Sequence, residues 1–359
     1  MKLSKAPRLI ILLMTFLVSM SFASQTVMAQ AEGIIATAWS PDGSKIAGAG
    51  TDGLLSIWDA NTGNLIRNFT GLSGTIYTVA WSPDSTKIAS PGDDKLIHIW
   101  NVSNGQLLAN LIGHYDDILS IDWSPDGSQI ASVSGNEQLS LRIWDTTTFQ
   151  QLNAFQAGNL QSVKWNINGS NIAVVNTNVG IMIVDPLANI PIQNWVNYLV
   201  GPNSTASGSA GSIAWRNDNT TIAVGYFDGK IYLWNVATNQ QITVLQGHTG
   251  WVGALSWNPD GTRLASASND GTVRVWNVTT GQQIGSFAKG QLLTTSIAWS
   301  PDGSQLAFGG INGTLEIVAA PVESTPTPRL RLQPHRHRRR PAPIATDSAI
   351  KKAQLSPRP

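Results

Sequence analysis

The stretch "SWNPDGTRLASASNDGTVRVWN" at residues 256–277 contains the unit that decides the fold. After its first tryptophan comes a Pro-Asp-Gly turn, in which proline fixes φ, aspartate bonds the nearby backbone and glycine takes a positive φ. Two short alternating runs follow, joined by the tight turn "NDG" at 269–271. The stretch ends on a second tryptophan, and its pattern predicts consecutive strands of an antiparallel meander.

The same pattern recurs along the chain, for example at 38–59 ("AWSPDGSKIAGAGTDGLLSIWD") and at 80–101. Its first tryptophan occurs seven times, at intervals of 42 residues with one interval of 50, at Trp39, Trp81, Trp123, Trp165, Trp215, Trp257 and Trp299. The second tryptophan occurs five times, at Trp58, Trp100, Trp144, Trp234 and Trp276. In the fourth and seventh copies valine takes its place, at Val184 and Val318.

Each copy reads as four short strands with apolar residues on both faces. One such sheet cannot bury both faces alone, whereas seven sheets stacked in a ring can. The sequence therefore predicts an all-β fold, a seven-bladed β-propeller of four-stranded antiparallel blades, over residues 33–322.

The 42-residue period, the "SPDG" turns, the "WD" or "WN" strand ends and two "GH" dipeptides give the chain a family resemblance. It resembles the WD-repeat propellers over about residues 33–320. This resemblance implies a non-catalytic scaffold that binds a protein or peptide. Because propellers of this kind share a fold across unrelated partners, it does not identify the partner.

The sixth copy contains His248, Ser266 and Asp270, residue types that also form hydrolytic triads. The resemblance implies a different role, a buried hydrogen-bonded tetrad that Trp276 completes. The third copy offers a partial version, formed by His114, Ser132 and Trp144. Because the set recurs in graded copies round a ring, we expect a structural and not a catalytic role.

The resemblance also implies a docking face, made by the turns before the first strand and after the second strand of each copy. Carried over by position, the partner-binding residues are Tyr77, Asp93, Asp117, Phe227, Trp251 and Asn269. Aromatic residues of this kind are enriched in interface hot spots. The alternative for the three aromatics is packing against the neighbouring blade.

The interval of 50 residues contains "NWVNYLVGPNSTASGSAG", in which Trp195 and Tyr198 precede a Gly/Ser loop. We expect these aromatics either to form a lip over the docking face or to cover the sheet from an outer strand. Both aromatics are candidates for partner binding.

The innermost strands carry only two charged residues, Asp122 and Lys164, in different copies. This separation argues against a catalytic or ligand site shared across the central channel, which is the main rival reading. The chain has no cysteine and five scattered histidines, and it lacks a phosphate-binding loop. We therefore expect no metal, no cofactor and no enzymatic activity.

The N-terminus has the order of a secretory signal peptide, with Lys2, Lys5 and Arg8 before an apolar run at 9–22 and small residues after it. Cleavage is expected after Ala23 or after Ala31, so residues 1–31 contain the signal. The chain is predicted to be exported, as a secreted, periplasmic or cell-surface protein.

The two ends raise the question of how the ring closes, because an open blade leaves strand edges unpaired. The missing outer strand could come from "QTVMA" at 25–29 or from "PTPRLRLQ" at 326–333, and the upstream segment is favoured.

Residues 323–359 form a Pro-rich basic tail that is predicted to be disordered. From residue 324 onward the chain has nine basic residues and one acidic residue. The propeller region has 11 basic and 21 acidic residues, so its net charge is −10. The tail either contacts anionic envelope polymers or only aids solubility. A structural cell-surface protein anchored by this tail is a further alternative, and we expect a monomeric propeller without a specific nucleic-acid partner.

Overall fold

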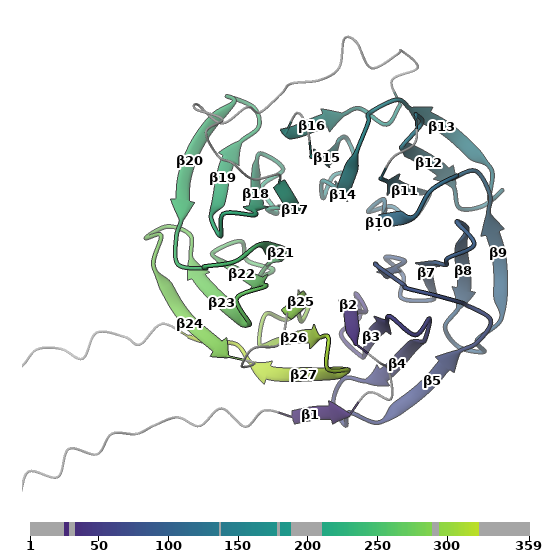
Figure 1. Ribbon diagram of the computed structural model, residues 1–359, viewed down its shortest axis with the longest axis horizontal. Helices are drawn as coiled ribbons and strands as arrows, with labels where there is room; N and C mark the ends of the chain where they lie inside the picture. Colours follow the sequence, from purple (N-terminus) through teal and green to yellow (C-terminus); the bar gives the residue numbers. More distant parts are fainter. Residues whose placement is uncertain are drawn as a thin grey trace, which may run out of the picture. The chain divides into compact units, whose positions relative to one another are not determined.

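The computed structural model describes residues 25–28, 33–135, 138–177, 180–187, 210–288 and 294–322. Within these ranges the regular structure is entirely β, and the strands form seven antiparallel sheets. The sheets follow one another round a ring, and the strands nearest the centre include β2, β10, β14, β17, β21 and β25 (Figure 1). The predicted all-β seven-bladed propeller is therefore confirmed.

The first three blades are complete four-stranded meanders. Blade 1 contains β2 (Ile34–Trp39), β3 (Lys45–Gly50), β4 (Leu55–Asp59) and β5 (Leu65–Phe69). Blade 2 contains β6 (Ala80–Trp81), β7 (Lys87–Pro91), β8 (Ile97–Asn101) and β9 (Leu107–Leu111). Blade 3 contains β10 (Ile118–Trp123), β11 (Gln129–Ser134), β12 (Leu141–Asp145) and β13 (Gln151–Phe155).

Blades 4 to 6 continue the same order. Blade 4 contains β14 (Leu160–Trp165), β15 (Ile172–Asn176) and β16 (Gly180–Val184). Blade 5 contains β17 (Ala210–Trp215), β18 (Thr221–Tyr226), β19 (Ile231–Asn235) and β20 (Gln240–Leu245). Blade 6 contains β21 (Val252–Trp257), β22 (Arg263–Ser268), β23 (Thr272–Asn277) and β24 (Gln283–Ala288).

Blade 7 is built from both ends of the propeller. It contains β25 (Thr294–Trp299), β26 (Gln305–Gly310), β27 (Thr314–Ala319) and, as its fourth strand, β1 (Gln25–Met28). Strand β1 pairs antiparallel with β27, with Gln25 opposite Ile317 and Met28 opposite Thr314, and it lies on the outer side of β27 (Figure 1). The upstream segment therefore closes the ring, and the fold begins before the predicted boundary at residue 33.

The turns between the first two strands show why Ser-Pro-Asp-Gly recurs. In blade 1, Asp42 Oδ1 accepts hydrogen bonds from Ser44 N at 2.9 Å and from Ser40 Oγ at 2.5 Å. Gly43 has a φ of 72°, a conformation that L side chains rarely adopt. Burial disfavours the charged form of Asp42, but the bonds from Ser40 and Ser44 outweigh it and lower its pKa below 3.8. These aspartates therefore organise turns.

The first tryptophan of each copy joins neighbouring blades. In blade 2, Trp81 Nε1 donates to Ala38 O in blade 1 at 3.1 Å. Four further contacts of this kind are Trp123 to Ala80 O, Trp215 to Lys164 O, Trp257 to Ala214 O and Trp299 to Ser256 O, all between 3.0 and 3.1 Å. The same bond between neighbouring blades therefore recurs at five of the seven first tryptophans.

Apolar packing also runs between blades. Trp39 of blade 1, for example, shares one buried cluster with Ala307 and Leu315 of blade 7. Each blade therefore buries its faces against its neighbours, as the two-sided strand pattern predicts. No helix in the described ranges is long and apolar enough to cross a membrane.

Candidate functional site

One edge of the propeller gathers the predicted partner-binding residues. In an antiparallel meander, the start of the first strand, the end of the second and the start of the third lie at the same edge. We call this edge the loop face, and in blades 2, 3, 5 and 6 it consists of residues 70–79, 92–96, 112–117, 135, 138–140, 227–230, 246–251 and 269–271. Backbone hydrogen bonds hold its segments together: Asp93 N donates to Ser73 O at 3.1 Å, and Asn269 N donates to Trp251 O at 2.9 Å.

An aromatic pair lies between blades 5 and 6 on the loop face. The rings of Phe227 and Trp251 stack with their centroids 4.9 Å apart and their planes 8° apart. Trp251 is half-buried over the first strand of blade 5, where a Cβ on Gly211 would overlap its Nε1. Phe227 remains 48% exposed. Trp251 therefore packs on the neighbouring blade and holds Phe227 at the surface.

A second group lies between blades 2 and 3. Tyr77 is 42% exposed, and both Asp93 and Asp117 are exposed near it. Burial raises the pKa of the Tyr77 phenol above 10.0, and the negative charges of Asp117 and Asp93 add to this effect. The phenol therefore stays protonated and keeps its O–H donor beside two carboxylates.

Sequence reasoning missed Tyr115, which lies in the loop before the first strand of blade 3. Its side chain is 78% exposed, and the guanidinium of Arg142 lies 5.7 Å from its ring centroid. Lys95 Nζ donates to the Tyr115 carbonyl at 2.8 Å and so ties this loop to blade 2. The signal was available, because Tyr115 directly follows a "GH" dipeptide in the segment before a first strand.

The central channel contains a cavity of about 500 Å³, lined by the first strands of the blades. The two charged residues that the sequence places in separate copies are brought together, with Lys164 Nζ 2.8 Å from Asp122 Oδ1. Asp122 Oδ2 also accepts a hydrogen bond from Trp165 N at 2.8 Å. Although the two charges belong to different copies, they form an ion pair, because adjacent blades place their first strands side by side.

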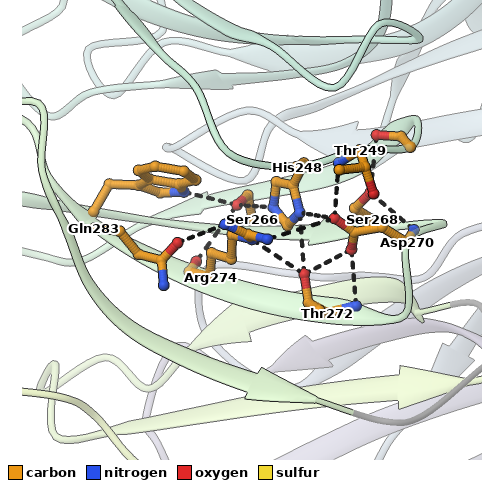
Figure 2. A network of polar contacts seen from close by, with 10 residues as sticks. His248, Thr249, Ser266, Ser268, Asp270, Thr272, Arg274 and Gln283 are labelled. Atoms are coloured by element: carbon orange, nitrogen blue, oxygen red, sulfur yellow. Dashed lines mark hydrogen bonds and ion pairs between the residues drawn. The ribbon is translucent and has the colours of Figure 1, made fainter.

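Blade 6 contains a connected polar network (Figure 2). Trp276 Nε1 donates to Ser266 Oγ at 2.8 Å, and Ser266 Oγ lies 2.7 Å from His248 Nε2. On the other side of the ring, His248 Nδ1 lies 2.9 Å from Asp270 Oδ2. Thr272 Oγ1 adds a 2.6 Å bond to Asp270 Oδ1. The four tetrad residues therefore form one chain from indole to carboxylate.

Burial and hydrogen bonding shift the pKa values of two residues in the blade 6 network. Burial disfavours the charged carboxylate of Asp270, but hydrogen bonds from Thr272, Thr249 N and His248 outweigh it and lower its pKa to about 2. Burial lowers the pKa of His248 below 6.5, more than the neighbouring carboxylate raises it. In its neutral form, with the proton on Nδ1, the imidazole donates a hydrogen bond to Asp270 and accepts one from the Ser266 hydroxyl at Nε2.

Although the order Ser-His-Asp is that of a hydrolytic triad, Ser266 is fully buried on the second strand of its blade. Its hydroxyl is already occupied by Trp276 and His248. A substrate could reach it only if the blade opened.

Blade 3 has a related network with a different last partner. Ser132 Oγ lies 2.7 Å from His114 Nε2 and accepts the Trp144 indole N–H at 2.8 Å. Arg142 Nε donates to His114 Nδ1 at 3.3 Å, whereas the corresponding histidine nitrogen in blade 6 faces Asp270. In blade 3 the histidine is therefore bonded to the Arg142 guanidinium at the position where blade 6 has a carboxylate.

Blade 2 contains two sets of polar contacts that sequence reasoning did not find. Trp100 Nε1 donates to Ser90 Oγ at 3.1 Å. His98 comes from the third strand β8, and its ring nitrogens lie 2.8 Å from Asn110 Oδ1 and 3.1 Å from Asp94 Oδ2. The expected histidine position in the preceding loop holds Leu72, so the histidine reaches the same part of the blade from another strand.

Some predicted features lie outside the described residues. These are Trp195 and Tyr198, the signal region 1–24 and the tail 323–359. Among the described residues, no group of three or more histidine, aspartate or glutamate side chains has the geometry of a metal site.

Comparison with known proteins gives one kind of match. A family model described as "WD domain, G-beta repeat" matches residues 24–59, 63–101, 105–145, 202–235 and 239–277, together more than half of the chain. No curated protein matches the sequence. The five matched stretches are those that contain the second tryptophan, and the copies that contain Val184 and Val318 are unmatched.

Proposed function

The chain belongs to the WD-repeat family of β-propellers, and from the geometry of its loop face we propose that it is a non-catalytic scaffold that docks a protein or peptide outside the cytoplasm. Membership of the family supports a protein-interaction role in general. The face, the compartment and the absence of catalysis are our proposals.

The observation that carries the docking site is the aromatic pair of blades 5 and 6. A half-exposed phenylalanine on a loop normally loses conformational freedom when it binds a partner, which weakens binding. Phe227 is already held flat on Trp251, and Trp251 is held by the close approach of Gly211. This preorganised apolar surface is typical of an interface hot spot.

The second group supplies polar contacts to the same partner. Tyr77 and Tyr115 expose aromatic rings, while Asp93 and Asp117 expose carboxylates. We propose that the partner places an apolar anchor on Phe227 and hydrogen-bond donors against the acidic side between blades 2 and 3.

The absence of catalysis is supported by the burial of Ser266 and by the pairing in the channel. The charges of Lys164 and Asp122 are directed at each other at 2.8 Å. If the channel were instead an active site, Lys164→Met would abolish an activity that loop-face variants leave intact.

Export is supported by the sequence of residues 1–23 and by the absence of cysteine. We propose that the mature protein is a monomer and that the basic tail contacts anionic polymers of the envelope. Fractionation of cells that produce the full chain tests the compartment, with a chain lacking residues 1–23 as the control. Release of a tail-deleted chain from the envelope would favour a cell-surface structural role.

A capture experiment tests the docking face. The mature protein is used as bait against secreted and envelope fractions, next to a Phe227→Ala, Tyr77→Ala double variant. We expect a specific partner whose affinity for the variant falls about 30-fold. The matched control is Leu65→Ala on β5, where an equally exposed apolar side chain (48%) lies outside the loop face. Equal capture by all three baits would contradict the site.

A further inference from the structure

The seam between blades 7 and 1 differs from the other contacts between neighbouring blades. At five seams the indole N–H of the first tryptophan donates to the preceding blade, as described above. At the seam between blades 3 and 4, Trp165 Nε1 lacks such a partner, but Asp122 binds both Lys164 and the Trp165 backbone. At the seam between blades 7 and 1, Trp39 Nε1 is buried without a partner.

A second buried polar atom at this seam is the hydroxyl of Thr37. Thr37 lies two residues before the first tryptophan, on the side of β2 that faces blade 7. The equivalent residues of the other blades are apolar: Val79, Ile121, Val163, Ile213, Leu255 and Ile297. Thr37 Oγ1 is buried and has no hydrogen-bond partner within the described part of the chain. A hydroxyl buried in this way destabilises the folded state relative to a methyl group.

Ser296 on β25 is the third such atom. In blade 5 the equivalent Ser212 Oγ donates across its seam to Val252 O at 3.0 Å, and in blade 3 Ser120 Oγ accepts from Val163 N at 3.2 Å. Ser296 Oγ is buried and makes no corresponding bond. Three unsatisfied polar atoms are therefore concentrated at the one seam where the ring is closed.

Chain connectivity at this seam depends on β1. After blades 1, 2, 3 and 5, where the connecting segments are described, the chain itself crosses from the fourth strand of one blade to the first strand of the next. Here it crosses through the segment between Met28 and Gly33, and this link exists only while β1 is present and paired with β27. A chain that began at Glu32 would lose both the fourth strand of blade 7 and the covalent crossing.

We propose that signal cleavage follows Ala23, and that the retained strand β1 acts as a latch on the weakest seam of the propeller. The proposal rests on the proposed export. It chooses between two cleavage sites that the sequence leaves open, because only cleavage before Gln25 keeps the strand that pairs with β27.

The first test determines the N-terminal residue of the exported full-length protein by intact mass and N-terminal sequencing. We expect Ser24. An exported chain that begins at Glu32 would overturn the cleavage assignment while leaving export intact. A chain that stays in the cytoplasm and begins at Met1 would overturn both the cleavage assignment and the proposed compartment.

The second test does not depend on export. Chains that begin at Ser24 and at Glu32 and both end at Pro359 are compared by melting temperature and hydrogen exchange. We expect the shorter chain to melt at least about 4 °C lower, with faster exchange in β27 and β2 than in β21. A synthetic peptide of residues 24–31 should restore the melting temperature of the shorter chain to that of the longer one. Equal melting temperatures and exchange would overturn the latch.

Single substitutions test the seam without removing a strand. Thr37→Val should raise the melting temperature by about 2 °C, because it removes the buried unsatisfied hydroxyl. The matched control is Val79→Thr, which places a hydroxyl at the same position of the seam between blades 1 and 2 and should lower it. A loss of stability in Thr37→Val would contradict the unsatisfied seam.

Discussion

Blade 6 and blade 4 have the same pairing of their three inner strands, but they bury polar side chains in blade 6 and apolar side chains in blade 4. In blade 6 the second strand contributes Ser266 and the third contributes Trp276, and both belong to the buried polar network (Figure 2). In blade 4 the equivalent residues are Val174 and Val184, which are buried in an apolar cluster. The strand pairing is nevertheless the same, with Val174 opposite Met182 as Ser266 is opposite Arg274.

This difference shows that the network is not required to form a blade. Buried polar groups often give little net stability compared with apolar residues of similar volume, but removing one member of a set is costly. Blade 6 is therefore expected to be sensitive to single substitutions, whereas blade 4 is expected to be sensitive to any polar group that is introduced. The family model follows the second tryptophan and not the fold, since it matches blade 6 and does not match blade 4.

The largest effect is expected from His248→Ala in blade 6. The substitution removes the donor to Asp270 and the acceptor of the Ser266 hydroxyl, and it should lower the free energy of unfolding by about 3 kcal/mol. Urea unfolding followed by tryptophan fluorescence measures the change. The control is Gln156→Ala. Gln156 occupies the position before blade 4 that corresponds to His248, but its side chain is exposed, so the substitution should change the free energy of unfolding by less than about 0.5 kcal/mol. Similar losses in both variants would contradict the comparison.

Val174→Ser in blade 4 should have the next largest effect. It places a hydroxyl at a fully buried position where blade 4 offers no counterpart of His248 or Trp276 among its described residues. We expect a loss of about 2 kcal/mol in the free energy of unfolding. Val174→Ala serves as the control for lost apolar volume. If serine proved more stable than alanine there, blade 4 would be able to satisfy a polar group after all.

The pH dependence of stability should separate the two blades further. The pKa of Asp270 is lowered from 3.8 to about 2, so its contribution is complete above pH 3.8 and is lost as the pH falls toward 2. Because burial lowers the pKa of His248 below 6.5, the protein should also begin to lose stability below that pH.

Asp270→Asn should therefore be less stable than the natural protein at pH 5, by of the order of 1–2 kcal/mol. The gap should close between pH 4 and pH 2. Thermal unfolding at a series of pH values measures it, and Val174→Ala should keep the natural profile in that range. A gap that stays constant down to pH 2 would show that Asp270 acts through packing and not through its charge.

The smallest effect concerns an ionic contact between blades 3 and 4. Lys164→Met breaks the ion pair with Asp122. Because both side chains are partly exposed, the free energy of unfolding should fall by less than about 1 kcal/mol. Lys230→Met is a matched control, because its pair with Asp228 has the same 2.8 Å distance and the same side-chain exposures of 41% and 20%. Both losses should shrink in 1 M salt when unfolding is measured by urea. A salt-independent loss in Lys164→Met alone would indicate a contribution other than charge.

The residues of the loop face could be predicted from the repeat, since Tyr77, Phe227 and Trp251 occupy fixed positions in it. Their arrangement could not. The stack of Phe227 on Trp251 requires Gly211, a residue of the neighbouring blade that lies 40 positions earlier than Trp251. The exposure of Tyr115 could not be predicted either, because it depends on how the loops of blades 2 and 3 meet.

The sequence by itself determined the number of blades, the strands within them and the turns that join them. These depend on residues close together in the chain: prolines and glycines that set φ, alternating apolar side chains, and a tryptophan every 42 residues. Even the tetrad of blade 6 lies within one copy, and so its members could be named in advance.

The tertiary structure alone decided which blades bond to each other and how the ring closes. The pairing of Asp122 with Lys164, the unsatisfied atoms of Thr37 and Ser296, and the docking of β1 on β27 all join different blades. Each depends on the distance and rotation between stacked sheets, which are set by packing around the whole ring and not by any local pattern of residues.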